Sequence, residues 1–192
     1  AWHYSAVGDF NGDGGTDIAS RDVLGDWYVA TTTGAAFNTQ TKWCRWAPTV
    51  DWSTPLVGDF DDNGTDDIAG RDNVGRWIVG ISDGVKFTKS AWGIWSLTSA
   101  WRDVLVGDFD GDGKDDIAGR DDVGRWIVCV STGTGFTKKA WGRWSPTETY
   151  HDVQTGNFNG DARRDIIGTD STGRRLVSLA TPTSSFTRAF WG

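Results

Sequence analysis

The chain has 192 residues, enough to bury a substantial core in one compact domain. Its formal charge is −7, and this acidic balance excludes a nucleic-acid partner, because phosphate contacts need clustered Lys and Arg. No run approaches the roughly 18 apolar residues of a membrane-spanning helix, so we also expect no membrane span.

The sequence repeats the same pattern four times. VGDF begins at Val7, Val57 and Val106, and the related TGNF begins at Thr155, which gives spacings of 50, 49 and 49 residues. Each repeat holds four short apolar segments separated by turns, and no stretch shows a helical period of 3.6 residues. In the first repeat the segments lie at about 3–8, 17–21, 26–32 and 37–46. This pattern predicts an all-β β-propeller whose four blades are four-stranded antiparallel sheets.

We predict a single β-propeller domain over residues 1–192. The expected blades span approximately 1–48, 49–97, 98–146 and 147–192. Three arrangements stay open: a closed ring of four blades, half of a larger ring that a homo-oligomer completes, or a piece of a longer array. A flat solenoid is the alternative architecture, although its repeats are usually shorter.

An acidic loop follows the first predicted strand of every repeat. In the third repeat Asp108, Asp110, Asp112 and Asp116 stand at loop positions 1, 3, 5 and 9. Carboxylates this close repel one another unless a cation neutralises them, and Ca²⁺ takes about 6–8 oxygen ligands. An EF-hand is excluded because Gly119 stands at position 12, where that loop needs a bidentate Glu. The pattern therefore predicts a Ca²⁺ loop between two strands.

Three of the four loops have a full set of oxygen ligands, counting the backbone carbonyl at position 7. In the first loop the predicted ligands are Asp9, Asn11, Asp13, Gly15 and Asp17. In the second loop they are Asp59, Asp61, Asn63, Thr65 and Asp67. In the third loop they are Asp108, Asp110, Asp112, Lys114 and Asp116. The fourth loop has Asn157, Asn159, Asp161 and Asp165 at the side-chain positions. Because only two acids remain there and Arg163 and Arg164 add positive charge within the loop, we predict about three Ca²⁺ ions and a weak or empty fourth site.

The segments VGDFNGDGGTDI, VGDFDDNGTDDI and VGDFDGDGKDDI resemble the FG-GAP/VCBS repeats of integrin-α-like propellers and of many secreted bacterial proteins. The resemblance extends over all four repeats. It implies a β-propeller that binds Ca²⁺ in the loops between the first two strands of each blade. A fungal lectin with integrin-like repeats binds sugar between its blades, so the resemblance also implies a lectin-like function.

Trp residues recur at fixed places in the repeats. Most of them are expected to pack blade against blade, because large aromatic side chains supply much of a core. This set is Trp27, Trp43, Trp46, Trp77, Trp92, Trp95, Trp126, Trp141, Trp144 and Trp191. The aromatics on the linkers entering each blade form a second set, for which we predict exposed faces that stack on a ligand. These ligand-binding candidates are Trp2, Trp52, Trp101 and Tyr150.

No catalytic constellation is recognisable in the sequence. It lacks a nucleophile elbow, a His-metal spacing and a phosphate-binding loop, so we expect no catalytic residues and no enzyme activity. We predict a calcium-stabilised extracellular binding module that binds carbohydrate through Trp-lined sites. A protein adhesion or oligomerisation module is the alternative, and a polysaccharide-degrading enzyme is the third hypothesis. Extracellular Ca²⁺ suits sites with Kd of about 10⁻⁴–10⁻³ M.

Overall fold

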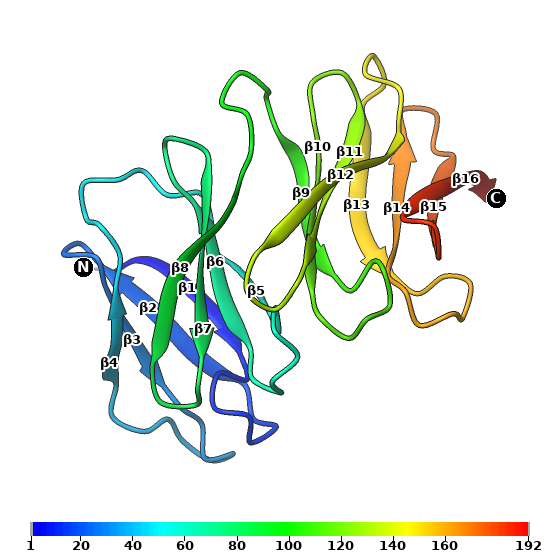
Figure 1. The fold of residues 1–192 in the computed structure, drawn as a ribbon. Helices are drawn as coiled ribbons and strands as arrows, with labels where there is room; N and C mark the ends of the chain where they lie inside the picture. The colour runs from blue at the N-terminus through cyan, green and yellow to red at the C-terminus, as the bar shows by residue number, and fades with distance from the viewer. Residues whose placement is uncertain (1, 192) are drawn as a thin grey trace. The chain divides into compact units, whose positions relative to one another are not determined.

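The computed structural model describes residues 2–191, which form four antiparallel sheets of four strands each (Figure 1). Blade one consists of β1 (Trp2–Gly8), β2 (Asp17–Asp22), β3 (Asp26–Ala30) and β4 (Thr41–Arg45). Blade two consists of β5 (Leu56–Gly58), β6 (Asp67–Arg71), β7 (Arg76–Ser82) and β8 (Phe87–Ile94). The strands of the first repeat match the predicted segments, except that the outermost strand is shorter.

The other two sheets follow the same plan. Blade three consists of β9 (Arg102–Gly107), β10 (Asp116–Arg120), β11 (Arg125–Ser131) and β12 (Phe136–Arg143). Blade four consists of β13 (Tyr150–Gly156), β14 (Asp165–Asp170), β15 (Arg175–Thr181) and β16 (Ser185–Trp191). Strand order within every sheet follows chain order, so each blade is a simple meander. The all-β prediction is confirmed. In the described part of the chain, no helix is long and apolar enough to cross a membrane.

The chain divides into two compact units, Ala1–Leu97 and Thr98–Gly192, and each unit contains two blades. In the first unit, buried aromatics of blade one pack against Ile68 and Phe87 of blade two. In the second unit, the corresponding aromatics of blade three pack against Ile166 and Leu176 of blade four. Nine of the ten Trp residues assigned to packing are buried, whereas Trp191 is 39% exposed. The six Trp residues of blades one and three lie in these two cores, which confirms the expected packing of blade against blade for them.

Within each unit, a Trp at the end of one blade inserts against a Gly of the next. Trp46 meets Gly70, where an added Cβ would lie 2.5 Å from Cζ3 of the indole. Trp144 meets Gly168 in the same way, at 2.8 Å. A side chain at either Gly would exclude the Trp ring, so these two glycines permit the blades to dock. Blade one carries Ser20 at the equivalent position.

Candidate functional site

The acid at loop position 9 begins the second strand of every blade and is completely buried. The four residues are Asp17, Asp67, Asp116 and Asp165. Each accepts two backbone hydrogen bonds, as Asp67 does from the amides of Phe60 at 2.9 Å and Ser82 at 2.7 Å. This carboxylate therefore ties its loop to the end of the blade's third strand. Sequence reasoning missed this structural role, although the presence of Asp165 in the loop with the fewest acids was a signal for it.

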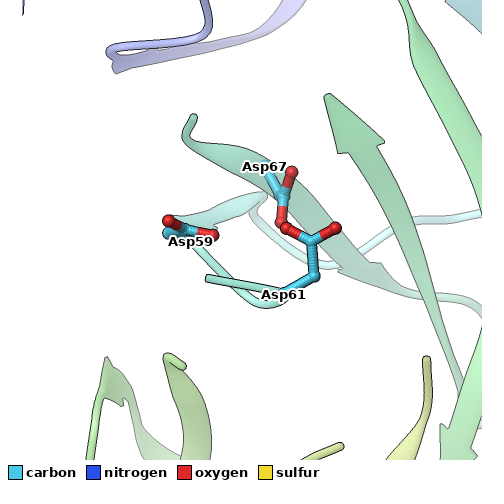
Figure 2. Close-up of side chains that lie close together, drawn as sticks. All are labelled: Asp59, Asp61 and Asp67. Atoms are coloured by element: carbon cyan, nitrogen blue, oxygen red, sulfur yellow. The ribbon is translucent and has the colours of Figure 1, made fainter. Parts of the chain in front are cut away.

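Two of the loops gather three carboxylates around one point. The groups are Asp59, Asp61 and Asp67 in the second loop and Asp108, Asp110 and Asp116 in the third. Within each group, one carboxylate oxygen of every residue lies within 4.8 Å of the others. Figure 2 shows the group of the second loop with its carboxylates turned together. The structure therefore brings positions 1, 3 and 9 together, as predicted for these two loops.

The electrostatics of these groups fit a divalent cation. Asp61 Oδ1 is buried without a hydrogen-bond partner. Burial, reinforced by the neighbouring charge of Asp59, raises the pKa of Asp61. Burial also raises the pKa of Asp67 and of Asp116 to about 8, against their backbone hydrogen bonds. Buried carboxylates without a counter-charge are costly, and a bound Ca²⁺ would supply that charge and fill the unused oxygen.

The side chain at loop position 5 accepts hydrogen bonds from within its own loop. Asn63 Oδ1 accepts the backbone N–H of Thr65 at 2.8 Å, and Asp112 Oδ1 accepts that of Lys114 at 2.9 Å. Lys114 Nζ also lies 3.0 Å from Asp112 Oδ2. Both side chains are therefore engaged in local turns, and Asp112 lies outside the gathered group of its loop. The predicted carbonyl ligands Gly15, Thr65 and Lys114 stay predictions.

The first and fourth loops differ from the other two. Among residues 2–191, neither loop has three acids gathered within 4.8 Å. In the first loop, Asn11 occupies position 3 and donates to Asp13 Oδ2 at 2.8 Å. In the fourth, Arg163 Nη2 donates to Asp161 Oδ2 at 2.6 Å, so a cation of the chain already lies beside that acid. The weak fourth site stays a prediction, and this ion pair supports it.

Acidic loops of neighbouring blades are hydrogen-bonded to each other within a unit. The backbone amide of Asp66 donates to the carbonyl of Asp9 at 2.8 Å, and the amide of Asp9 donates back to Asp66 Oδ2 at 2.7 Å. In the second unit, the amide of Arg164 donates to the carbonyl of Asp108 at 2.7 Å. The loops therefore also join one blade to the next.

A pocket of the same construction lies between the two blades of each unit. The first, of about 280 Å³, is lined by Ala47, Val50, Trp52, Asp72, Arg76, Ile78, Lys89, Ser90 and Ala91. The second, of about 320 Å³, is lined by Ser145, Glu148, Tyr150, Asp170, Arg174, Leu176, Arg188, Ala189 and Phe190. Each position of the first pocket recurs 98 or 99 residues later in the second. The same repeat positions therefore form the pocket in both units.

Both pockets combine one aromatic face with charged groups. Trp52 packs against Trp46 with ring centroids 4.6 Å apart, and Tyr150 packs against Trp144 at the same distance. The aromatic ring is thereby held against the inserted Trp, and Arg120 Cζ also lies over the Tyr150 ring, 5.0 Å from its centroid. An acid that caps the neighbouring turn pairs with an Arg in each pocket: Asp72 with Arg76 at 2.7 Å, and Asp170 with Arg174 at 2.8 Å.

A second cation completes each pocket. Lys89 and Arg188 occupy equivalent places and donate to the backbone carbonyls of Arg45 and Arg143. Sequence reasoning did not single these cations out, although a basic residue recurs third in the segments FTKS, FTKK and FTRA. Of the four predicted ligand-binding aromatics, the structure places Trp52 and Tyr150 in these pockets. Trp2 lies on an exposed face at 52% exposure, and Trp101 is half-buried and lines neither pocket.

Repeated four-stranded antiparallel blades with these loops define a propeller-type binding or adhesion module. The family described as FG-GAP-like repeat matches residues 108–168, from the third acidic loop into β14. Residues 108–168 thus match the FG-GAP-like repeat, and the resemblance inferred from the sequence is confirmed there. No curated protein sequence matches the chain.

Two solved structures align with nearly the whole chain. The WD40 domain of SCAP from fission yeast aligns with 100% of this chain and 42% of its own, at a TM-score of 0.54 and 9% identity. The crystal structure of BBS1N in complex with ARL6DN, soaked with lead, aligns with 99% of this chain and 56% of its own, at a TM-score of 0.49 and 13% identity. The chain therefore spans less than half of the WD40 structure, and that likeness shows the β-propeller fold.

Proposed function

We propose that this chain is an extracellular, calcium-stabilised module that binds carbohydrate. The observation that carries the proposal is the repeat-related pair of pockets. A sugar ring has an apolar C–H face and a rim of hydroxyl groups. Small-ligand sites occupy about 300–1,000 Å³ and combine apolar surface with a few placed polar groups. The pockets, at about 280 and 320 Å³, lie just below and just above the lower limit of that range.

The charged groups of each pocket suit hydroxyl recognition. In the first pocket, Trp52 offers the face for stacking, while Asp72 and Arg76 offer an acceptor and donors beside it. Hydrogen bonds in which one partner is ionised are roughly twice as strong as neutral ones. Since Tyr150, Asp170 and Arg174 repeat the arrangement, one chain would present two sites to a polysaccharide and gain avidity from both.

Calcium has a structural role in this proposal. The gathered acids of loops two and three would be the ligands, with about three ions predicted for the chain including the first loop. Because the loops are bonded to their neighbours, a bound ion would fix the docking of two blades and hence the pocket between them. Extracellular Ca²⁺ would keep such sites filled even at modest affinity.

The carbohydrate test uses the full chain on an array of mono- and oligosaccharides, in calcium and in chelator. Wild type is expected to bind in calcium at two sites. Trp52→Ala and Tyr150→Ala should each remove one site, and the double variant should remove both. Leu24→Ala, at an exposed turn residue outside both pockets, is the control and should bind as wild type. A silent array with folded protein would overturn the carbohydrate proposal and favour a protein ligand, and reducing-end release would reveal an enzyme.

The calcium test is separate. Titration calorimetry on chelator-treated protein is expected to show about three ions per chain, with Asp61→Ala losing one. A protein that binds no calcium and keeps its melting temperature in chelator would refute the calcium proposal, whatever the array shows.

A further inference from the structure

The lining of the first unit's pocket carries a net positive charge. Arg76 and Lys89 are cations, and Asp72 is the one acid among the lining residues. Asp51, which follows the lining residue Val50 in the chain, does not line the pocket. The whole chain has a formal charge of −7, so the sign of this pocket is opposite to that of the protein.

The acid of this pocket is nearly saturated by hydrogen bonds within its own turn. Asp72 Oδ1 accepts the amides of Val74 at 3.0 Å and Arg76 at 2.8 Å. Asp72 Oδ2 accepts Arg76 Nε at 2.7 Å, and the side chain is 1% exposed. A carboxylate has about four acceptor sites, so at most one of them is left for a ligand.

Donors, in contrast, are left over on both cations. Arg76 uses Nε for Asp72, and its two Nη groups have no acceptor among the described residues. Lys89 donates to the carbonyl of Arg45 and keeps its other N–H groups, because an ammonium group carries several donors. The unused hydrogen-bonding groups of the first pocket are therefore mainly cationic donors, which bind anionic acceptors most strongly.

A buried cation adds to the positive potential beside this pocket. Arg21 is 2% exposed, and its Nη2 donates at 2.9 Å to the carbonyl of Ala47, which lines the pocket. Its Nε has no hydrogen-bond partner, and within residues 2–191 it forms no ion pair. Its counterpart in the second unit, Arg120, pairs with Asp103 at 2.7 Å. Only the first pocket therefore lies beside a buried Arg without a paired carboxylate.

The pocket of the second unit is balanced in charge. Glu148 stands where the first pocket has Val50, and it gives the lining a second acid besides Asp170. Arg174 Nε and Nη2 both lie on Asp170 Oδ2, at 2.9 and 2.8 Å. Arg174 Cζ also lies 4.7 Å from the centroid of the Phe190 ring. This guanidinium is therefore more fully engaged within the protein, and an anion entering the pocket would meet Glu148.

The acidic loops lie too far away to cancel the charge of the first pocket. Each loop ends where the second strand of its blade begins, whereas Asp72 follows the end of that strand. Since β6 has 5 residues, its two ends are roughly 17 Å apart at roughly 3.3 Å per residue. The Debye length at physiological ionic strength is only about 8 Å.

We propose that the first pocket selects a sugar ring bearing an anionic group, a carboxylate or a sulfate ester, and that the second pocket takes neutral sugars. Trp52 packs on the ring, while Arg76 and Lys89 bind the anion beside it through charge-assisted hydrogen bonds. This inference rests on the proposed carbohydrate function and deepens it for one of the two pockets.

The test is titration calorimetry with sugars that differ only in the group on the sixth carbon. Methyl glycosides of the gluco, galacto and manno series are compared as the neutral sugar, the uronate and the 6-sulfate, in calcium. Tyr150→Ala isolates the first pocket and Trp52→Ala the second. We expect the first pocket to bind an anionic sugar roughly five- to tenfold more tightly than its neutral partner. This preference should shrink at about 1 M salt, and the uronate and sulfate arms identify the anion.

Charge variants locate the preference within the pocket. Lys89→Gln should lower the ratio of anionic to neutral affinity at least threefold, and Lys89→Arg, which keeps the charge, should retain it. Val50→Glu copies the acid of the second pocket and should abolish the preference. Lys86→Gln is the matched control, because it removes one exposed cation from the β7–β8 turn, outside both pockets. Circular dichroism verifies the fold of each variant, and a two-site fit to wild type replaces any pocket variant that fails to fold.

Four outcomes would overturn the inference. Equal affinity for anionic and neutral sugars would refute it and leave the carbohydrate function standing, whereas silence toward every sugar in folded protein would refute both. An equal preference for anions in Trp52→Ala would show that the first pocket is not the selective one. A loss of preference in Lys86→Gln as large as in Lys89→Gln would assign the effect to the net charge of the protein.

Discussion

Replacing Gly70 by Ala tests the docking of blades most directly. Gly70 lies in β6 without a positive φ, so backbone geometry alone would favour Ala by about 0.4–1 kcal/mol. The added Cβ, however, would lie 2.5 Å from Cζ3 of Trp46. That indole is buried and is held by Trp27 at 5.3 Å and Trp52 at 4.6 Å, measured between ring centroids, so it has little room to withdraw.

The steric cost should outweigh the gain. Overpacking a well-packed core costs typically about 1–3 kcal/mol, and we expect Gly70→Ala to lower the free energy of unfolding of the first unit by about 1–2 kcal/mol. Urea unfolding followed by Trp fluorescence measures the change. Leu24→Ala, at an exposed turn residue of blade one, is the control and should change stability by less than about 0.5 kcal/mol. If Gly70→Ala matched or exceeded wild-type stability, the reasoning about blade docking would be refuted.

Three further predictions concern buried polar groups. In chelator, the free energy of unfolding should fall as pH rises from about 4 to about 8, because Asp67 and Asp116, with pKa about 8, hold protons in the folded protein that the unfolded chain releases. Saturating calcium should reduce this fall. A free energy of unfolding that rises with pH in chelator would contradict the prediction. Ser178→Ala should cost about 1–3 kcal/mol in a thermal or urea melt, since it removes the acceptor 2.7 Å from the buried Trp144 Nε1, and an unchanged melt would show that the indole needs no partner. Asp165→Ala should cost about 2–4 kcal/mol whether or not calcium is present, because two backbone amides lose their acceptor; a cost seen only in calcium would instead assign Asp165 to a metal site.

Local sequence patterns were sufficient to predict the blades. The repeat of VGDF and the alternation of apolar segments with Gly turns depend on neighbouring residues only, and the strands lie where these patterns placed them. The burial of Trp27, Trp77 and Trp126 also followed, because large aromatics at a fixed place in every repeat have few other roles.

The candidate site was only partly predictable. Alternate spacing correctly placed Asp59 and Asp61 together, but it could not reveal that Asn63 turns toward the amide of Thr65. Nor could it reveal the pockets, because residues as distant as Trp52 and Lys89 meet there through strand pairing and blade docking. A pattern read along the chain contains no information on such distant partners.

The hydrogen bonds between adjacent acidic loops couple the two blades of each unit to one another. Opening one blade would strip Asp9 or Asp108 of its amide donor from the neighbour and expose the inserted Trp. Amide hydrogen exchange should therefore report one protection level across both blades of a unit.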